Sequence, residues 1–175
     1  MKVLVTAATR HGSTAMIGDA IREELVATGV TAHLLEPELI RDIGEYDAVV
    51  IGSGVYAGRW LKPARKFVQR FEAQLAAKPV WLFSSGPIGD PARPTEPPAE
   101  ALEIAARLGA QDHQVFEGRL ERAGLGFGER AVVRAMKAES GDYRPWVAIT
   151  VWARRISASL KREAQPRLEM AGSRR

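Results

Sequence analysis

The sequence contains no cysteine. This absence excludes disulfide bonds, thiolate catalysis, iron–sulfur clusters and cysteine-ligated zinc. Long apolar runs are absent too, since runs such as residues 48–51 are far shorter than the roughly 20 residues that span a bilayer. The first residues lead directly into an apolar strand pattern, with none of the features of a secretory signal. We therefore expect a cytoplasmic protein.

Histidine is also scarce. His11, His33 and His113 are scattered along the chain without a ligand spacing such as His-x-x-x-His, so we expect no metal site. Asp112 and His113 are adjacent, but neighbouring residues of a strand point to opposite faces, which argues against an acid–base pair. No interleaving of aromatic and basic residues suggests a nucleic-acid partner.

The composition is that of a globular domain. The 175 residues are 46% hydrophobic and 26% charged, enough for one domain with a sizeable core. The sequence pI is about 9.7 and the net charge is +4. Such a charge is compatible with an anionic ligand, an anionic lipid surface or nucleic acid, and equally with an ordinary basic surface.

Apolar runs alternate with helical periodicity along the chain. The runs predict strands at residues 2–7, 31–35, 48–52, 79–83 and 114–116. Amphipathic spacing predicts helices at residues 13–28, 62–76, 99–108 and 146–160. This alternation indicates an α/β fold, a three-layer α/β/α sandwich with a five-stranded parallel sheet of order 2-1-3-4-5. We expect one domain at residues 1–163 and a polar, frayed tail at 164–175.

Two segments interrupt this rhythm. Residues 86–98 contain five prolines and are predicted to be a stiff loop, either a wall beside a ligand site or an ordinary surface loop. Residues 118–141 form an unusually long connection. Within it, residues 129–138 have the apolar and basic pattern of a short helix.

The loop after the first strand suggests an anion site. It reads Thr9-Arg10-His11-Gly12-Ser13-Thr14 and directly precedes a helix. Backbone N–H groups and the helix dipole attract anions at such a point, and the hydroxyl groups add donors. The alternative is a simple helix N-cap. No Gly-Lys-Ser/Thr follows, which argues against a nucleotide triphosphate site.

Two further loops follow strands that should end at the same edge. Residues 52–60 follow the third strand, and residues 84–89 follow the fourth. Ligands of open α/β sheets bind at the carboxyl ends of the strands. Tyr56 could stack on a flat ring there, or pack only against its own loop. Trp60 is more consistent with packing at the start of the next helix.

Taken together, the three loops resemble those of the flavodoxin family. The resemblance covers nearly the whole chain and implies bound FMN. Its implied phosphate site is Thr9, Arg10, His11, Gly12, Ser13 and Thr14. Its implied isoalloxazine site is Gly54, Val55, Tyr56 and Ala57, with Ser84, Ser85 and Gly86 along the polar edge of the ring. No side chain need act as a catalytic base.

A narrower resemblance concerns the first loop and two other motifs. Thr-Arg-x-Gly-x-Thr, Tyr-Asp-x-Val-Val-Ile-Gly from Tyr46, and the pair Trp152-Ala153 are similar to the menaquinone-dependent protoporphyrinogen IX dehydrogenase branch. This implies an oxidoreductase of heme biosynthesis with a quinone acceptor. Residues 125–138 occupy the place of the basic, apolar insert of that branch, with Phe127 as the only aromatic residue.

The net positive charge of the chain indicates which partners to expect. Flavodoxins that shuttle electrons are typically acidic, whereas a basic site would attract an anionic substrate such as a porphyrinogen. A quinone or a redox partner protein would take the electrons, with peripheral contact at the inner face of the membrane. A flavodoxin-like electron carrier and a flavin-free interaction domain remain alternatives, and a homo-oligomer is compatible with either.

Overall fold

The computed structural model describes residues 1–86, 96–120 and 140–172, with side chains up to residue 163. Most of the proline-rich loop and the predicted short helix at 129–138 lie outside the described residues.

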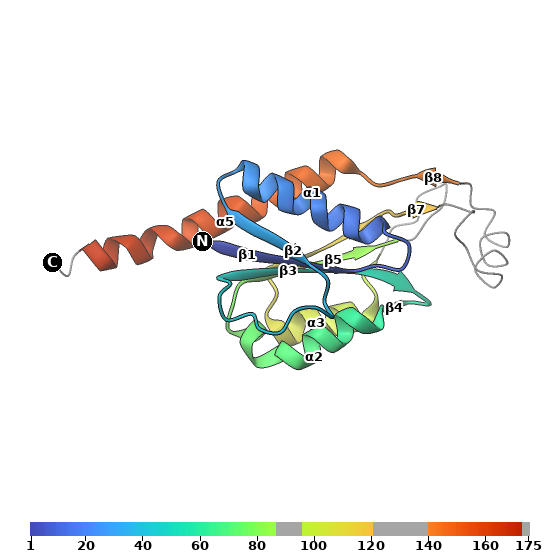
Figure 1. Cartoon of the computed structure of the whole chain (residues 1–175), viewed down its shortest axis with the longest axis horizontal. Helices are drawn as coiled ribbons and strands as arrows, with labels where there is room; N and C mark the ends of the chain where they lie inside the picture. The colour runs from blue at the N-terminus through green and yellow to red at the C-terminus, as the bar shows by residue number, and fades with distance from the viewer. Residues whose placement is uncertain (87–95, 121–139, 173–175) are drawn as a thin grey trace.

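The centre of the molecule is a parallel sheet (Figure 1). Its five parallel strands are β1 (Lys2–Ala8), β2 (Thr31–Leu35), β3 (Ala48–Tyr56), β5 (Val80–Ser85) and β6 (Asp112–Phe116). They lie in the order β2-β1-β3-β5-β6, which confirms the predicted order. A two-residue strand, β4 (Arg59–Trp60), pairs antiparallel with the end of β3.

Helices cover both faces of the sheet, which confirms the three-layer sandwich (Figure 1). Helices α1 (Ser13–Ala27) and α5 (Trp146–Gly172) lie on one face, and α2 (Lys62–Ala76) and α3 (Ala99–Leu108) lie on the other. No described helix is long and apolar enough to cross a membrane.

Several elements are longer than their sequence patterns predicted, including β1, which ends at Ala8, and β5, which ends at Ser85. Strand β3 continues past Gly52 to Tyr56, because its end also pairs with β4. Strand β6 begins at Asp112 rather than Gln114, in register with Trp81 of β5. Helix α5 continues past Leu160 to Gly172, since helix formers such as lysine, arginine, glutamate and alanine follow the last apolar position.

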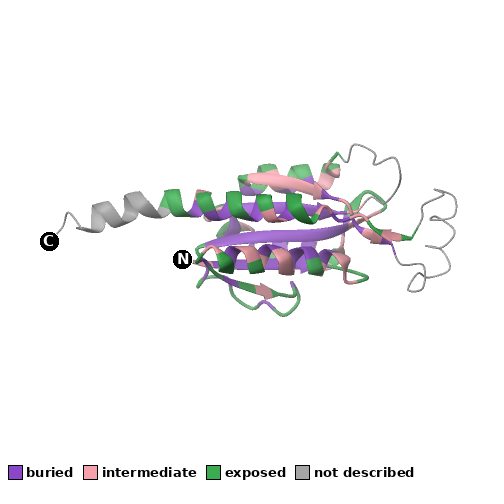
Figure 2. Cartoon of the chain, turned by 90° about the horizontal axis from the view of Figure 1, so that it is seen from above, coloured by how far each residue is buried: buried purple, intermediate pink, exposed green. Residues whose placement is uncertain are grey.

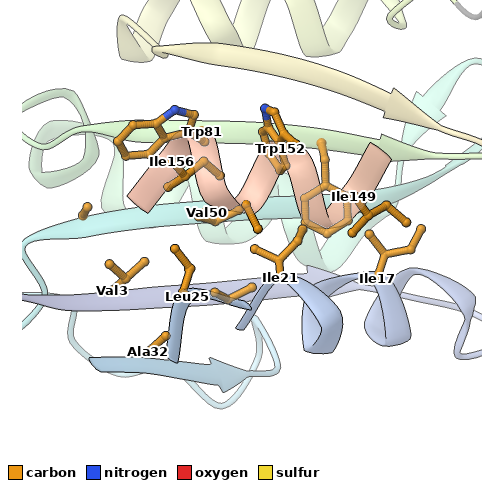
Figure 3. Packing of buried hydrophobic residues seen from close by; sticks show 14 of the residues in the cluster. Val3, Ile17, Ile21, Leu25, Ala32, Val50, Trp81, Ile149, Trp152 and Ile156 are labelled. Atoms are coloured by element: carbon orange, nitrogen blue, oxygen red, sulfur yellow. The ribbon is translucent and has the colours of Figure 1, made fainter. Parts of the chain in front are cut away.

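Each face of the sheet packs into its own apolar layer, and the central strands β1, β3 and β5 are mostly buried, whereas the outer strands β2 and β6 are partly exposed (Figure 2). On the α1 and α5 side, Ile21, Val50 and Trp152 belong to one cluster that joins both helices to the sheet (Figure 3). Burial of such side chains contributes roughly 1.5–3 kcal/mol each. This packing fixes the positions of the strand ends that carry the candidate site.

Gly52 of β3 lies directly beneath an aromatic ring of the next strand. It is in register with Phe83 of β5, and a Cβ atom added at Gly52 would come within 2.0 Å of the ring atom Cζ. Phe83 is fully buried and packs against the rings of Phe116 and Trp152. The absence of a side chain at position 52 therefore makes room for this aromatic cluster.

Helix α5 is also fixed by polar contacts. The Trp152 Nε1–H donates to Asp112 Oδ2 of β6 at 2.7 Å. The Arg154 guanidinium pairs with Glu24 of α1 at 2.7 Å. The indole bond is the stronger constraint, because Trp152 is 4% exposed whereas Arg154 reaches its partner from the surface.

Candidate functional site

The loop between β1 and α1 lies at the carboxyl end of the sheet. Gly12 is the N-cap of α1 and has a left-handed backbone with φ of 79°. It offers no side-chain capping bond, and the first turn of α1 contains no acidic residue. The helix N-terminus therefore presents backbone N–H groups and a positive dipole end without a competing carboxylate in that turn.

The hydroxyl groups of this loop have different surroundings. Thr9 is exposed, whereas Thr14 is 4% exposed at the start of α1. The Ser13 hydroxyl accepts a hydrogen bond from the backbone N–H of Arg119 at 3.1 Å. The two residues are 106 positions apart, and no sequence motif had indicated this contact.

Arg119 belongs to β7 (Arg119–Leu120), which pairs antiparallel with β8 (Gly141–Asp142). The nearly buried Arg144 guanidinium donates to Asp142 Oδ2 at 2.6 Å and lies 4.4 Å from the Trp146 ring centroid. Hydrogen bonds from Arg144 hold the pKa of the Asp142 carboxyl below its usual range. This ion pair is local to residues 142–144, and the Arg119–Ser13 bond is the contact that joins the two strands to the loop at 9–14.

The second loop is a tight hairpin between β3 and β4. Tyr56 faces Arg59 across the turn, and the two central residues, Ala57 and Gly58, have φ of 49° and 72°. Two consecutive left-handed residues are typical of a two-residue hairpin turn. A left-handed alanine costs roughly 1–2 kcal/mol. The turn holds Tyr56 at the very end of β3.

Tyr56 joins the second loop to the first. Its ring centroid lies 5.4 Å from the guanidinium carbon of Arg10 and 6.5 Å from the His11 ring. A Cβ atom added at Gly54 would lie 3.3 Å from both Thr14 Oγ1 and Tyr56 Cε2. The absence of a side chain at Gly54 therefore allows the two loops to adjoin, as the sequence pattern predicted.

Ser84 and Ser85, predicted to lie in the third loop, are the last two residues of β5, because both pair with the neighbouring strands. Ser84 is fully buried and Ser85 is 5% exposed, while the backbone N–H of Gly86 donates to Phe116 O at 3.0 Å. The Ser84 hydroxyl accepts from Trp60 Nε1 at 2.8 Å. This side chain thus points toward α2 and α3, and contact of these residues with the polar edge of a flavin stays a prediction.

Asp112 and His113 face opposite sides of the sheet, as predicted. Asp112 binds Trp152 on the α5 side, while His113 Nε2 lies 3.0 Å from the Ser84 hydroxyl. Burial lowers the pKa of His113 from its ordinary value of 6.5, although the Asp112 charge opposes the shift. The folded protein therefore favours the neutral imidazole.

We expect the stability of the protein to fall in mild acid because of His113. Since burial lowers the pKa of His113 in the folded state, the unfolded chain takes up this proton first as the pH falls below 6.5. The contribution is fully present above pH 6.5 and is lost toward the lower folded pKa. Urea unfolding at pH 7.5 and 5.5 would measure it. An equal loss in His113→Gln would contradict the assignment.

Both the sequence and the fold of this chain are similar to those of known proteins. A family model described as a flavodoxin domain matches residues 4–145. A search of curated proteins found no match. A cysteine-to-serine mutant of flavodoxin from Pseudomonas aeruginosa has a similar structure, with a TM-score of 0.61, 15% identity and coverage of 92% of this chain and 99% of that one.

Two other solved structures are similar. A flavodoxin from the Archaea has a TM-score of 0.53 and 21% identity, and the match covers 66% of this chain and 82% of that one. Rubredoxin oxygen:oxidoreductase from Desulfovibrio gigas has a TM-score of 0.63 and 16% identity, and the match covers 93% of this chain but 37% of the larger enzyme. The family model spans most of the chain, and the chain therefore belongs to the flavodoxin domain family.

Proposed function

We propose that this protein binds FMN at the carboxyl edge of its sheet and acts as an oxidoreductase. The observation that carries the proposal is the junction of the first two loops. There Gly12, the N-cap of α1, has a left-handed backbone, and the Tyr56 ring lies near Arg10 and His11. A helix N-terminus suits a phosphate group, and an aromatic side chain suits a flat ring.

The residues present fit FMN. The phosphate would be held by the backbone of the loop at 9–14 and by the Thr9 and Thr14 hydroxyls. A Cβ atom at Gly54 would lie 3.3 Å from the Thr14 hydroxyl, so the absence of a side chain there leaves that hydroxyl uncrowded. Tyr56 would flank the ring system. Bound FMN supplies hydride or single-electron transfer, while the protein provides binding, orientation and electrostatics.

The finer proposal is a protoporphyrinogen IX dehydrogenase with a quinone as electron acceptor. Two exposed arginines, Arg10 and Arg59, come from the loops that would surround the flavin. Cations beside a binding site raise the local concentration of anionic substrates. A porphyrinogen carries carboxylates and would be attracted in this way.

The alternative is a one-electron carrier, an activity in keeping with the flavodoxins that share this fold. The dehydrogenase and the electron carrier differ in their substrates and in their partners. A dehydrogenase oxidises protoporphyrinogen IX directly when menaquinone is supplied. A carrier leaves that substrate unchanged but is reduced and oxidised by partner proteins, one electron at a time.

The first test is the visible spectrum of the purified protein, followed by an FMN titration. Oxidised flavin bands and saturable quenching of FMN fluorescence are expected, whereas a colourless protein that takes up no FMN would overturn the proposal. The FMN-loaded protein is then mixed with protoporphyrinogen IX and menaquinone. Absence of oxidation under these conditions would reject the dehydrogenase and favour the carrier.

Tyr56→Leu is expected to weaken FMN binding roughly five- to tenfold, because aromatic contacts contribute about 0.5–1.5 kcal/mol beyond burial. Tyr56→Phe retains the ring and should bind nearly as well as the wild type. Fluorescence titration measures both affinities. If the leucine variant bound FMN as tightly as the phenylalanine variant, Tyr56 would have no stacking role.

A further inference from the structure

A largely buried chain of hydrogen bonds joins the strands that carry the second and third loops. Trp60 Nε1 donates to Ser84 Oγ at 2.8 Å, and Ser84 Oγ lies 3.0 Å from His113 Nε2. Trp60 is 1% exposed and Ser84 is fully buried. The chain therefore connects β4 of the second loop to the end of β5, where the third loop starts, and then to β6 at the edge of the sheet.

The chemistry of the three groups limits which of them can donate each hydrogen bond. An indole N–H can only donate, so Ser84 Oγ must accept from Trp60. The hydroxyl proton of Ser84 can then be given to His113 Nε2, provided that this nitrogen is unprotonated. His113 Nδ1 is buried and has no hydrogen-bond partner among the described residues. A neutral imidazole can accept from Ser84 or, in its other tautomer, donate to it, whereas a protonated imidazole can only donate to an oxygen that already accepts from Trp60.

The hairpin formed by β3 and β4 is held at two other points. The backbone N–H of Trp60 donates to Glu100 Oε2 at 3.0 Å, and that of Leu61 donates to Ser53 Oγ at 2.9 Å. Trp60 is thus bound through both its backbone and its ring. Because Trp60 pairs with Val55, one residue before Tyr56, its position sets where the Tyr56 side chain lies.

We propose that Trp60, Ser84 and His113 are positioning residues for the flavin, and that they link FMN affinity to the protonation of His113. The proposal rests on the proposed FMN function and identifies a regulation of that same site. While His113 is neutral, the hydrogen bonds among Trp60, Ser84 and His113 hold the second and third loops in fixed positions relative to one another. Protonation deprives the buried Ser84 hydroxyl proton of this acceptor and places a charged Nδ1–H where the described residues offer no hydrogen-bond partner, which weakens the link between the two loops.

Within the part of the protein that the structure describes, few charged groups surround the chain. Asp112 adjoins His113 on β6, and the Glu100–Arg65 ion pair meets the backbone of Trp60. Asp112 favours the protonated imidazole, and burial of the ring opposes it more strongly. His113 is therefore neutral at pH 7.5, and FMN affinity is expected to decline as the pH falls below 6.5.

The first experiment compares two matched tryptophan substitutions. Trp60→Phe removes the indole N–H that binds Ser84, while Trp152→Phe removes the N–H of another buried indole, which binds Asp112 on the other face of β6. At pH 7.5 we expect Trp60→Phe to weaken FMN binding roughly tenfold and Trp152→Phe to leave it within about twofold. Equal affinities would overturn the inference. Should Trp60→Phe fail to fold, Ser84→Ala interrupts the same chain.

The second experiment measures FMN affinity from pH 7.5 to 5.5 in the wild type and in His113→Gln. The glutamine amide can still bond to Ser84 but does not titrate. We expect the wild type to lose roughly five- to tenfold more affinity than the variant, since ionisation of the FMN phosphate affects both proteins alike. Identical pH profiles would overturn the link to His113. Absence of FMN binding by the wild type would instead overturn the proposed function itself.

Discussion

Gly12→Leu is expected to abolish FMN binding, with an affinity loss of roughly a hundredfold or more. Gly12 has φ of 79°, a conformation that costs a leucine about 1–2 kcal/mol. Relief of that strain would rotate the peptide units at the start of α1, and the N–H groups that should meet the phosphate would point elsewhere. Quenching of FMN fluorescence by the variant, compared with the wild type, measures the loss.

The opposite end of the same helix offers a matched control. Gly29 has φ of 85°, and, as at Gly12, an added Cβ atom would meet nothing within 4 Å. Gly29→Leu should therefore cause similar backbone strain without touching the loop at 9–14. We expect its FMN affinity to equal that of the wild type. Retained binding in Gly12→Leu, or equal loss in both variants, would show that the loop does not hold the phosphate.

Gly52→Ala should destabilise the protein by about 3 kcal/mol or more, corresponding to a fall in Tm of roughly 6–12 °C. The added methyl group would come within 2.0 Å of the Phe83 ring, closer than atoms can approach. Phe83 cannot easily move, because Phe116 and Trp152 pack against it and the ring is fully buried. Thermal unfolding followed by circular dichroism measures the change.

Gly44→Ala is the appropriate comparison. An added Cβ atom there would approach only the Asp42 side chain, at 3.2 Å, and this flexible group can shift. We expect a change in Tm of less than about 2 °C, since mutations outside the core have small effects. A similarly small effect of Gly52→Ala would mean that the aromatic cluster tolerates rearrangement, and that Gly52 has no packing role.

These two glycines, Gly12 and Gly52, show that one residue type can serve two physical purposes. Gly12 is required by its backbone angle and has open space around it, whereas Gly52 is required by the ring above it. Both belong to segments singled out from the sequence as loops of the cofactor site. In the structure, however, both Gly52 and Gly54 belong to β3, and it is Gly54, near the end of the strand, that lies beside Thr14 of the first loop.

The sequence by itself determined the layers, the order of the strands and the edge at which the loops meet. These follow from local patterns: apolar runs form buried parallel strands, amphipathic segments form the covering helices, and right-handed crossovers leave few topologies. Parallel strands all end at one edge, so the loops at 9–14 and 52–60 had to adjoin. The contact of Tyr56 with Arg10 is consistent with that reasoning.

Only the tertiary structure decided how the side chains beneath the site are connected. The Arg119–Ser13 bond joins residues 106 positions apart, and the chain from Trp60 through Ser84 to His113 joins three strands. The hydrophobic periodicity of the sequence predicts which face of an element a residue occupies, but not which residue across the core it contacts. Hydrogen-bond partners depend on the register and packing of the whole sheet, so Ser84, expected at the flavin edge, turned its hydroxyl inward to Trp60.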